Sequence, residues 1–591
     1  MYFRRFFVRL SSLMFLVILI TSSSLAVHAQ YQSKPVSKYT AYPPSSSPAS
    51  LTDYWNGTAK WEFQRKFSSN ISAEGASLHA VGSTWYLFTR EYGAGGSPTS
   101  ACPAGYGTTY IWKSTNQGVS WSNSQKLLEI YPFDLKTQNP IPWGCWATDG
   151  DAYYNASTRT WHYLFQCMAN DGRGIWNGCH ITVTGSDPTT GTLGSPWPNP
   201  VIHRGDLWSN ICIPGRDCYI SNPQDRVTEE GTFDIFGFAY GYYFVNFHGV
   251  GYPPTSTGQR IPYSYRGIAV TPDFRTWYTG NKPPPGMDLG LPTSAVLSVN
   301  DVVTSGPQRW AEEWDGSTGA PAGGPIGPAS GGIFADAPNG MYYFSAEFYS
   351  ITIDCAYQIS DTALFRAPTL NTKPWQQFPK RNPIMYSATD GTYCNLRYSR
   401  FFQDANGYMY LLVGRPDTRT GVASIYFYKL VPNTNILTNG DIWRAAYAGV
   451  PYEGWAKINP ATNLVSYRFP PKSNDGNQFL EMNCANVSLP CSGVYQDVNV
   501  SHLRGKKYRY GGCFRTASST GKITMAVWQF TSSGPSSTSK TFNVDPNKYY
   551  CISSDSEYSI GSPTSTLRYE IYLHNRDINF RADNMYVNIT N

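Results

Sequence analysis

The chain has 591 residues, 15% of which are charged, and a formal net charge of +6 at pH 7. That charge is small for the length and the sequence has no lysine or arginine run, so we exclude nucleic acid as a partner. Aromatic residues make up another 15%, which is typical of buried sheet faces and of rings that stack on sugars.

Residues 1–29 are predicted to be a signal peptide. Three arginines, Arg4, Arg5 and Arg9, come first, and the apolar run Leu13–Ile20 follows them. Val27-His28-Ala29 then offers small residues for cleavage. The run is shorter than the roughly 20 apolar residues that cross a bilayer, so we expect a secreted, extracellular protein without a membrane span. Residues 30–50 are rich in serine and proline and are expected to form a flexible lead-in.

Twelve cysteines fit this export route, because disulfides persist in oxidising compartments. Eight lie before residue 430 and four lie after it, so each half can close its bridges internally. Spacing does not fix connectivity, but Cys212–Cys218 and Cys484–Cys491 are our predicted local pairs. N-x-S/T sequons, the acceptors of N-linked glycans, begin at Asn56, Asn70, Asn155, Asn486, Asn499 and Asn588.

Residues 51–432 repeat a turn followed by a short aromatic strand. The five repeats begin at Thr84, Thr160, Gly241, Gly340 and Gly407, which lie 76, 81, 99 and 67 residues apart. Five strand-rich units with long connections predict a five-bladed β-propeller, in which radial repetition protects the sheet edges. A long multi-sheet sandwich is the alternative. A sustained helical apolar period is missing from the sequence, so the fold class is all-β.

The segment from Ser114 to Trp121, STNQGVSW, resembles the Asp-box of sialidase-type propellers, with Asn116 where aspartate is usual. Asparagine can make the same turn-closing hydrogen bond. The segment from Thr271 to Trp277 is a looser relative. Both are predicted to be hairpin devices whose tryptophan packs between strands, and they indicate fold rather than catalysis.

Residues 433–591 change to short alternating strands, which predict a C-terminal β-sandwich of the jelly-roll type. Their order resembles galactose-binding-like carbohydrate-binding modules. That resemblance implies a glycan partner bound by exposed rings, and Trp528, Tyr510 and Tyr495 are the candidates. A plain spacer is the alternative, because related sandwiches also serve that role.

Hydrolysis of a glycosidic bond needs one carboxylic acid and one carboxylate that face a common centre. Acidic residues stand ahead of the first three aromatic strands: Glu74, Asp149 with Asp151, and Glu229 with Glu230. Each of them could instead be a turn former or a solvated group. The pair Glu312 and Glu313, between Trp310 and Trp314, competes with them, and a solvated loop is its simpler interpretation.

Two of these positions resemble motifs of glycoside hydrolase family 43 and its five-bladed relatives. Residues 146–149, WATD, are similar to the family's second motif, and residues 230–232, EGT, are similar to its third. The resemblance implies that Asp149 tunes the acid and that Glu230 protonates the leaving oxygen. The base would be Glu74, where the family has an Asp-Pro pair, with Asp53 as a fallback.

Other positions bear on substrate and metal. Trp146 and Arg397 are predicted to bind substrate. Ser330 stands where relatives often carry a histidine that organises the central channel or its ion, and Glu347 or His248 could compensate. A structural calcium ion has no specific motif here, so we predict no cofactor.

These features predict a secreted, monomeric glycoside hydrolase that inverts neutral polysaccharide linkages. One alternative is a non-catalytic, lectin-like propeller. Another is a sialidase-like hydrolase that clamps an acidic substrate with arginines; the strand arginines are Arg90, Arg266, Arg397 and Arg400, but the F/Y-R-I-P opening of sialidases is missing from the sequence.

Overall fold

The computed structural model describes a little over three fifths of the chain. The described residues are 38, 48–67, 73–91, 109–122, 146–168, 176–194, 196, 198–203, 205–207, 227–251, 263–297, 327–350, 359–378, 384–385, 396–417, 422–437, 455–458, 463–467, 479–483 and 491–590. The predicted signal peptide, the predicted pair Cys212–Cys218, Cys484, and the acids Glu312 and Glu313 lie outside them.

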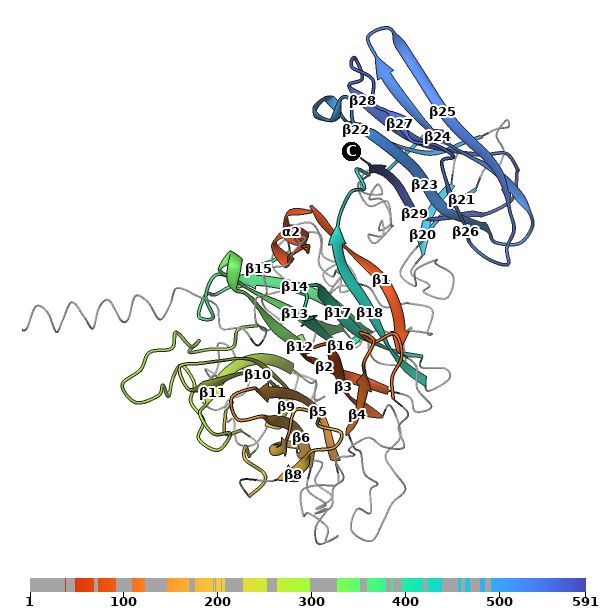
Figure 1. Ribbon diagram of the computed structural model, residues 1–591. Helices are drawn as coiled ribbons and strands as arrows, with labels where there is room; N and C mark the ends of the chain where they lie inside the picture. Colours follow the sequence, from red (N-terminus) through yellow and green to blue (C-terminus); the bar gives the residue numbers. More distant parts are fainter. Residues whose placement is uncertain are drawn as a thin grey trace, which may run out of the picture.

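Five small antiparallel sheets follow one another along the first part of the chain (Figure 1). The first sheet contains β2 (Ala73–Val81), β3 (Thr84–Glu91) and β4 (Thr109–Ser114). The second contains β5 (Trp146–Asn155), β6 (Thr160–Met168), β7 (Trp176–Thr184) and β8 (Thr192–Gly194). The third contains β9 (Val227–Ala239), β10 (Tyr242–Gly251) and β11 (Tyr263–Thr271). The fourth contains β12 (Gly327–Asp336), β13 (Met341–Ser350), β14 (Ile359–Ala367) and β15 (Gln376–Gln377). The fifth contains β16 (Arg397–Gln403), β17 (Met409–Asp417), β18 (Val422–Pro432) and β1 (Ala59–Phe67).

The five sheets close into a ring. Their first strands contact one another in the cyclic order β2, β5, β9, β12, β16, and β16 contacts β2 again. The last sheet combines strands from both ends of this region, because β1 pairs with β18 from Ala59 opposite Pro432 to Phe67 opposite Ile425. The predicted five-bladed propeller is therefore confirmed, and the five aromatic repeats form the second strand of every blade.

Aromatic residues on the second strands hold neighbouring blades together. Trp85 of β3 packs against Phe402 and Tyr410 of the fifth blade, with ring centres 4.8 and 5.3 Å apart. Trp161 of β6 packs against Tyr86 of the first blade at 5.4 Å. Large buried rings at blade interfaces account for much of the aromatic content of this part of the chain.

Every first strand carries a β-bulge at an equivalent height, where the pairing register shifts. In four of them the residue after the last regular pair has a positive φ: Gly75 (67°), Asp149 (54°), Thr232 (38°) and Tyr398 (54°). Glycine adopts this conformation readily, but the other three residues do so at a cost. Because bulges re-aim side chains, the same height of each blade presents side chains differently from a regular strand.

Both Asp-box segments form the predicted hairpin device. The side-chain Oδ1 of Asn116 accepts from the backbone N–H of Ser120 at 2.9 Å, and Trp121 packs against Phe67 and Phe427. In the looser relative, Asp273 Oδ1 accepts from the N–H groups of Arg275 and Thr276. Each box follows the third strand of its blade, as expected for a fold marker.

A short helix, α2 (Leu51–Asn56), precedes β1. Ser50 and Asp53 cap it reciprocally, with Asp53 Oδ2 accepting from Ser50 N–H at 2.8 Å. Thr52 contacts Asp336 at the end of β12. Asp53 is thus a helix cap, and its interpretation as a fallback base is wrong.

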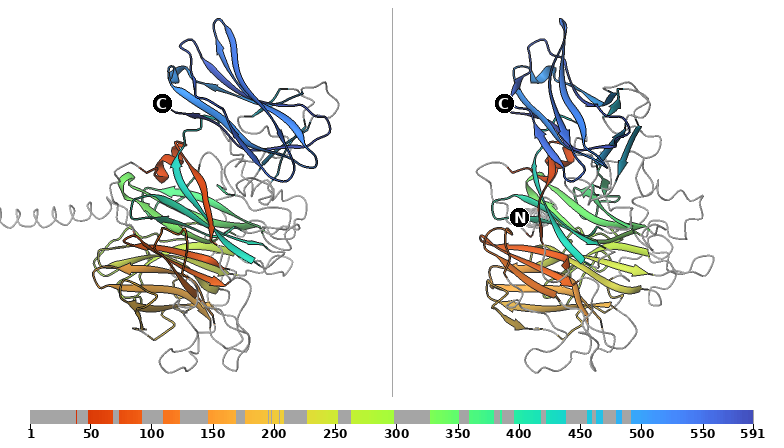
Figure 2. Two further views of the ribbon diagram at one scale, coloured as in Figure 1. Left: turned by 45° about the vertical axis from the view of Figure 1, so that its right-hand side comes forward. Right: turned by 90° about the vertical axis from the view of Figure 1, so that its right-hand side faces the viewer.

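The C-terminal part is a two-sheet β-sandwich, drawn in blue in Figures 1 and 2. One sheet has the order β19 (Ala456–Lys457), β22 (Cys491–Asn499), β28 (Thr566–Leu573), β24 (Gly521–Thr531), β25 (Gly534–Val544). The other has the order β20 (Asn463–Tyr467), β21 (Phe479–Asn483), β29 (Phe580–Ile589), β23 (Lys507–Thr516), β26 (Tyr550–Ser553), and β27 (Tyr558–Ser559) also pairs with β23. Their facing side chains form one apolar core.

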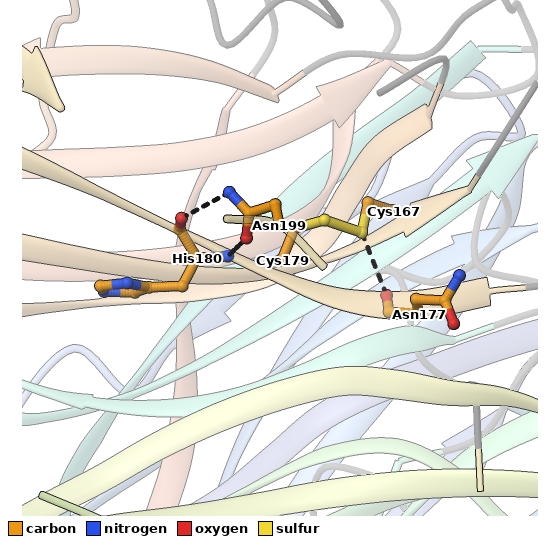
Figure 3. The surroundings of a disulfide bond; sticks show 5 residues. All are labelled: Cys167, Asn177, Cys179, His180 and Asn199. Carbon is orange, nitrogen blue, oxygen red and sulfur yellow. Dashed lines mark hydrogen bonds between the residues drawn. A yellow bond between two sulfur atoms is a disulfide. The ribbon is translucent and has the colours of Figure 1, made fainter. Parts of the chain in front are cut away.

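Two disulfides lie among the described residues, and each closes within its own half of the chain as predicted. Cys167–Cys179 joins β6 to β7, and Cys513–Cys551 joins β23 to β26. Figure 3 shows the first bridge, beside which the side chain of Asn199 binds both the N–H and the C=O of His180. These bridges are consistent with an extracellular protein. Among the helices that the structure describes, none is long and apolar enough to span a membrane.

Candidate active site

Glu74 and Asp149, two of the three predicted catalytic carboxylates, share one arginine. Arg90 of β3 donates from Nε to Glu74 Oε1 at 3.0 Å and from Nη1 to Asp149 Oδ2 at 3.0 Å. Glu74 lies immediately before the bulge of β2, and Asp149 lies within the bulge of β5. The structure therefore brings these two carboxyl groups together at one end of the ring of first strands.

The fifth blade supplies two more residues to this cluster. Tyr398, in the bulge of β16, donates its hydroxyl to Asp149 Oδ2 at 3.2 Å, and the Arg90 guanidinium lies 5.0 Å from the centre of the Tyr398 ring. Arg397 Nη1 lies 4.0 Å from Glu74 Oε1, with 24% of its side chain exposed. Arg397, predicted to bind substrate, thus belongs to the cluster and reaches its surface.

Each of the two carboxylates keeps one buried oxygen for another donor. Glu74 Oε2 and Asp149 Oδ1 have no hydrogen-bond partner within the described part of the chain. Burial raises the pKa of Asp149, although Arg90 opposes the shift. A buried carboxyl group with a raised pKa and one unpartnered oxygen is suited to exchange a proton or to accept a hydroxyl donor.

Glu230, the third predicted carboxylate, lies on β9, the neighbour of β5. It is fully buried, and its two oxygens accept from the backbone N–H of Leu207 at 3.1 and 3.3 Å. It lies one residue before Gly231, which is the β9 equivalent of Glu74, so it lies at the same end of the ring. A Cβ at the next residue, Gly231, would collide with the side chain of Gln166, so a larger residue there would have to displace that side chain.

Ser330 and Glu347, from the fourth blade, are buried against the bulge of β16. They contact each other, and both accept from the backbone N–H of Tyr398, at 2.8 Å for Ser330 Oγ and 3.3 Å for Glu347 Oε2. Burial raises the pKa of Glu347, while Arg397 opposes the shift. The other predicted substitute for a histidine, His248, is buried on β10, where burial and Arg266 lower its pKa.

Metal binding is not indicated by the residues that the structure describes, which include no group of three or more histidine, cysteine, aspartate or glutamate side chains able to hold an ion. The expectation that the protein needs no cofactor stays a prediction.

A second buried charge cluster lies farther along the same first strands. Asp151 Oδ2 accepts from Lys38 Nζ at 2.6 Å and from the backbone N–H of Ile235 at 2.8 Å. Arg400 Nη1 lies 3.2 Å from Asp151 Oδ1 and 3.4 Å from Asp234 Oδ1. Asp234 Oδ2 also accepts from the N–H of Ile333 at 2.8 Å.

This second cluster joins the first four blades in succession. Ser77, Asp151 and Asp234 occupy equivalent positions after their bulges, and they accept from the N–H of Ala152, Ile235 and Ile333 in the following blade. Burial alone would raise the pKa of Asp151, but Lys38 and Arg400 hold it well below its ordinary range. A permanently ionised carboxylate with a full set of donors is a structural element.

Among the described strand arginines, Arg90, Arg266 and Arg400 do not form the arginine clamp of a sialidase. Arg90 binds Glu74 and Asp149, and Arg400 binds Phe233 O and Asp234. Arg266 donates to Asn246 and Thr232, and burial lowers its pKa to about 9. Because protein acceptors occupy these guanidinium groups, they are not available to bind a substrate carboxylate.

The sandwich carries a polar and aromatic face on its β22-β28-β24 sheet. Trp528 Nε1 donates to Glu570 Oε2 at 2.6 Å, and Tyr572 also contacts Glu570. Arg568 pairs with Asp497 at 2.6 and 2.8 Å and lies over the ring of Tyr495 at 4.2 Å. Alternate residues of a strand share a face, so these side chains line the surface opposite the core. Their rings and charged groups could contact a sugar together.

One of the predicted binding residues of the sandwich lies in its core. Tyr510 of β23 is 1% exposed within the core. It cannot stack on a sugar, so the prediction of an exposed ring is wrong for Tyr510. The side chain of Trp146 lies outside the described part, although the residue begins β5.

Sequence reasoning missed Tyr398 and Lys38. Tyr398 has no motif of its own, but its place in the bulge equivalent to that of Asp149 is a signal that becomes visible once the blades are aligned. Lys38 lies in the predicted flexible lead-in, yet its ammonium group is buried against Asp151. A serine- and proline-rich segment gives no hint of such a contact.

The sequence matches no protein-family model and no curated protein. Among solved structures it is similar to a glycoside hydrolase family 43 arabinoxylan arabinofuranohydrolase from Bacillus subtilis in complex with cellotetraose, at 11% identity over 88% of this chain and 96% of that one, with a TM-score of 0.36. It is also similar to an exo-1,5-α-L-arabinanase from a bovine ruminal metagenomic library, at 10% identity over 61% and 95% of the two chains, with a TM-score of 0.34.

The chain is also similar to part of the CBM22-1–GH10 modules of xylanase 10B from Clostridium thermocellum complexed with xylohexaose, at 17% identity and a TM-score of 0.20. That match covers 23% of this chain and 26% of the other, so this chain spans about a quarter of that protein's length. These are the two classes of protein that the sequence resembles.

Proposed function

We propose that the protein is a secreted glycoside hydrolase that cleaves a neutral polysaccharide with inversion at the anomeric carbon. The observation that carries this proposal is the pair of buried carboxylates, Glu74 and Asp149, joined by Arg90 and each with an unpartnered oxygen within the described residues. This pair supplies the candidate base and the residue that would tune the acid, and Glu230 would be the acid that glycosidic hydrolysis also requires.

In this mechanism Glu74 accepts a proton from water through Oε2, and the water oxygen attacks the anomeric carbon from the face opposite the leaving group. Glu230 donates its proton to the departing glycosidic oxygen. Asp149, held by Arg90, supports the protonated state of Glu230 through its negative charge. Arg397, at the edge of the cluster, would bind a sugar hydroxyl.

The test replaces each carboxylate by its amide and measures release of reducing sugar from a panel of neutral polysaccharides. We expect Glu230→Gln and Glu74→Gln to lose about 10²- to 10⁴-fold in turnover, while the exposed Glu62→Gln on β1 serves as the matched control. With Glu230→Gln, activated aryl glycosides should lose much less, because their leaving groups need little protonation. Unchanged release of natural glycan by the mutants would reject the assignment.

Inversion makes a further demand that a structure with bound product can check. The carboxyl groups of Glu74 and Glu230 should lie about 6.5 to 9.5 Å apart, which leaves room for the attacking water, whereas about 5 Å would indicate retention. Proton NMR of the first product anomer gives an independent answer.

A non-catalytic, lectin-like propeller is the second candidate function. The observation that favours it is the neutralisation of Glu74 by Arg90, with Arg397 also close, as in a structural ion pair. Wild-type protein that binds glycans but releases no sugar from any of them would support this alternative.

We also propose that the sandwich binds the same polysaccharide through Trp528 and its neighbours on the outer sheet face. Trp528→Ala should weaken glycan binding by roughly 30-fold, the loss of about 2 kcal/mol that is typical of an aromatic anchor. The matched control is Tyr426→Phe in the propeller. Affinity electrophoresis with soluble glycans measures both, and equal retention of the two variants would make the sandwich a spacer.

A further inference from the structure

Tyr398 adopts a backbone conformation that its side chain does not favour. Its φ is +54°, and the equivalent bulge position in β2 is Gly75 at +67°. The propeller can therefore build this bulge with glycine, for which the conformation carries no strain. A tyrosine that is held there at an energetic cost indicates that its side-chain contacts have a function.

The fourth blade makes hydrogen bonds to the backbone of Tyr398 and of the residue after it. The N–H of Tyr398 donates to Ser330 Oγ at 2.8 Å, and the C=O of the next residue, Ser399, accepts from Ser345 Oγ at 2.9 Å. All of these residues are buried, and Glu347 contacts the hydroxyl of Ser330. Two hydrogen bonds from one blade thus fix the peptide geometry of the other.

These two hydrogen bonds hold Tyr398 where it can orient Asp149. The Tyr398 hydroxyl and Arg90 Nη1 both donate to Asp149 Oδ2, at 3.2 and 3.0 Å. Asp149 Oδ1 has no partner among the described residues. Two donors on one oxygen prevent the carboxyl group from turning and leave its other oxygen to the reacting groups.

We propose that Tyr398 is a positioning residue that orients Asp149, and that Ser330 fixes Tyr398 for this task. The proposal rests on the proposed function, which it deepens by adding a second layer of residues behind the candidate site. It does not require Tyr398 or Ser330 to contact the glycan.

The charged and titratable groups that act on Asp149 are Glu74 on β2, Arg90 on β3, Tyr163 on β6, and Arg397 with Tyr398 on β16. The neighbouring strand β9 carries Glu230. Tyr398→Phe removes a donor to the ionised form, so the pKa of Asp149 rises further. Asp149 then carries less negative charge at working pH and supports the protonated state of Glu230 less well. The alkaline limb of the kcat/KM profile should therefore move to lower pH by about one unit, with kcat reduced and KM little changed.

Ser330→Ala should move the alkaline limb in the same direction, and the double variant should move it little more than Tyr398→Phe alone, because both changes act through one contact. Tyr426→Phe, in the same sheet as Tyr398, is the matched control and should leave the profile unchanged. Shifts that add in the double variant, or lower thermal stability with an unchanged pH profile, would overturn the proposal.

A measurement without turnover separates this proposal from the proposed function. In urea denaturation, the midpoint shifts of Tyr398→Phe and Asp149→Asn should fail to add in the double variant, because the first removes the donor of one hydrogen bond and the second makes its acceptor neutral. If the wild type hydrolyses no glycan but this coupling is found, the proposed function fails and the positioning contact stands. Additive midpoint shifts would show that Tyr398 and Asp149 do not interact in solution.

Discussion

Asp149 and Asp151 are two residues apart on the same strand, and both are buried, yet their surroundings push their pKa values in opposite directions. Asp149 lies in the bulge, where burial raises its pKa despite Arg90, and it keeps one oxygen without a partner among the described residues. Asp151 lies beyond the bulge, where Lys38 and Arg400 outweigh burial and lower its pKa.

This difference separates two tasks along the first strands of one propeller. A carboxylate with complete donors and two cations stays ionised and ties blades together, and it has nothing left to offer a substrate. A carboxylate with incomplete donors is poorer for stability but can exchange a proton. Residue type and burial alone do not separate the two, whereas the count of donors on each oxygen does.

The largest expected effect is on the tying carboxylate. Asp151→Asn leaves Lys38 and Arg400 buried with one partner fewer, so the free energy of unfolding should fall by about 3 to 5 kcal/mol. Urea denaturation of the propeller, followed by tryptophan fluorescence, measures this loss. A loss below about 1 kcal/mol, the range of surface ion pairs, would remove the distinction between the two clusters.

Removing the cation should have a related but smaller effect. Lys38→Met keeps much of the side-chain volume and leaves Asp151 with Arg400, Ile235 N–H and Ser77, so we expect a loss of about 2 to 3 kcal/mol. Lys113→Met is the matched control, because Lys113 pairs with Asp187 on the surface and should contribute less than about 1 kcal/mol. Equal losses would mean that Lys38 is not buried against Asp151 in solution.

The candidate catalytic carboxylate should respond with the opposite sign. Asp149→Asn removes a charge whose burial is incompletely compensated, so the free energy of unfolding at neutral pH should rise by about 1 kcal/mol while turnover falls. Calorimetry and reducing-sugar release, performed on the same preparation, test both halves of this expectation. A marked destabilisation would place Asp149 with Asp151 among the structural residues.

The pH dependence of these effects is the smallest and most specific test. The folded-state pKa of Asp151 is lowered, so its stabilisation is complete above the unfolded pKa of about 4 and is lost as the pH falls through the folded value. The folded-state pKa of Asp149 is raised, so its favourable contribution exists below the unfolded pKa and is lost as the pH rises through the folded value. The stability gained by Asp149→Asn should therefore appear only on the alkaline side, and an equal gain at pH 3 would contradict it.

Local patterns in the sequence predict much of this molecule, because they reflect local physics. The five aromatic repeats become the second strand of each blade, since a turn followed by alternating rings specifies a strand that buries one face. The Asp-box segments close hairpins through their own side chains and need no distant partner. The order of acidic residues before successive blades also predicts that Glu74 and Asp149 meet, because equivalent strands of a propeller converge on one axis.

Tertiary structure alone decides which face of a strand is buried and which distant residues meet. Tyr510 lies on an alternating strand whose sequence fits either face, and sheet packing places it in the core. Lys38 reaches Asp151 across 113 residues, and Tyr398 reaches Asp149 across 249. These contacts exist only once β1 pairs with β18 and the ring closes, so no pattern within a short window can encode them.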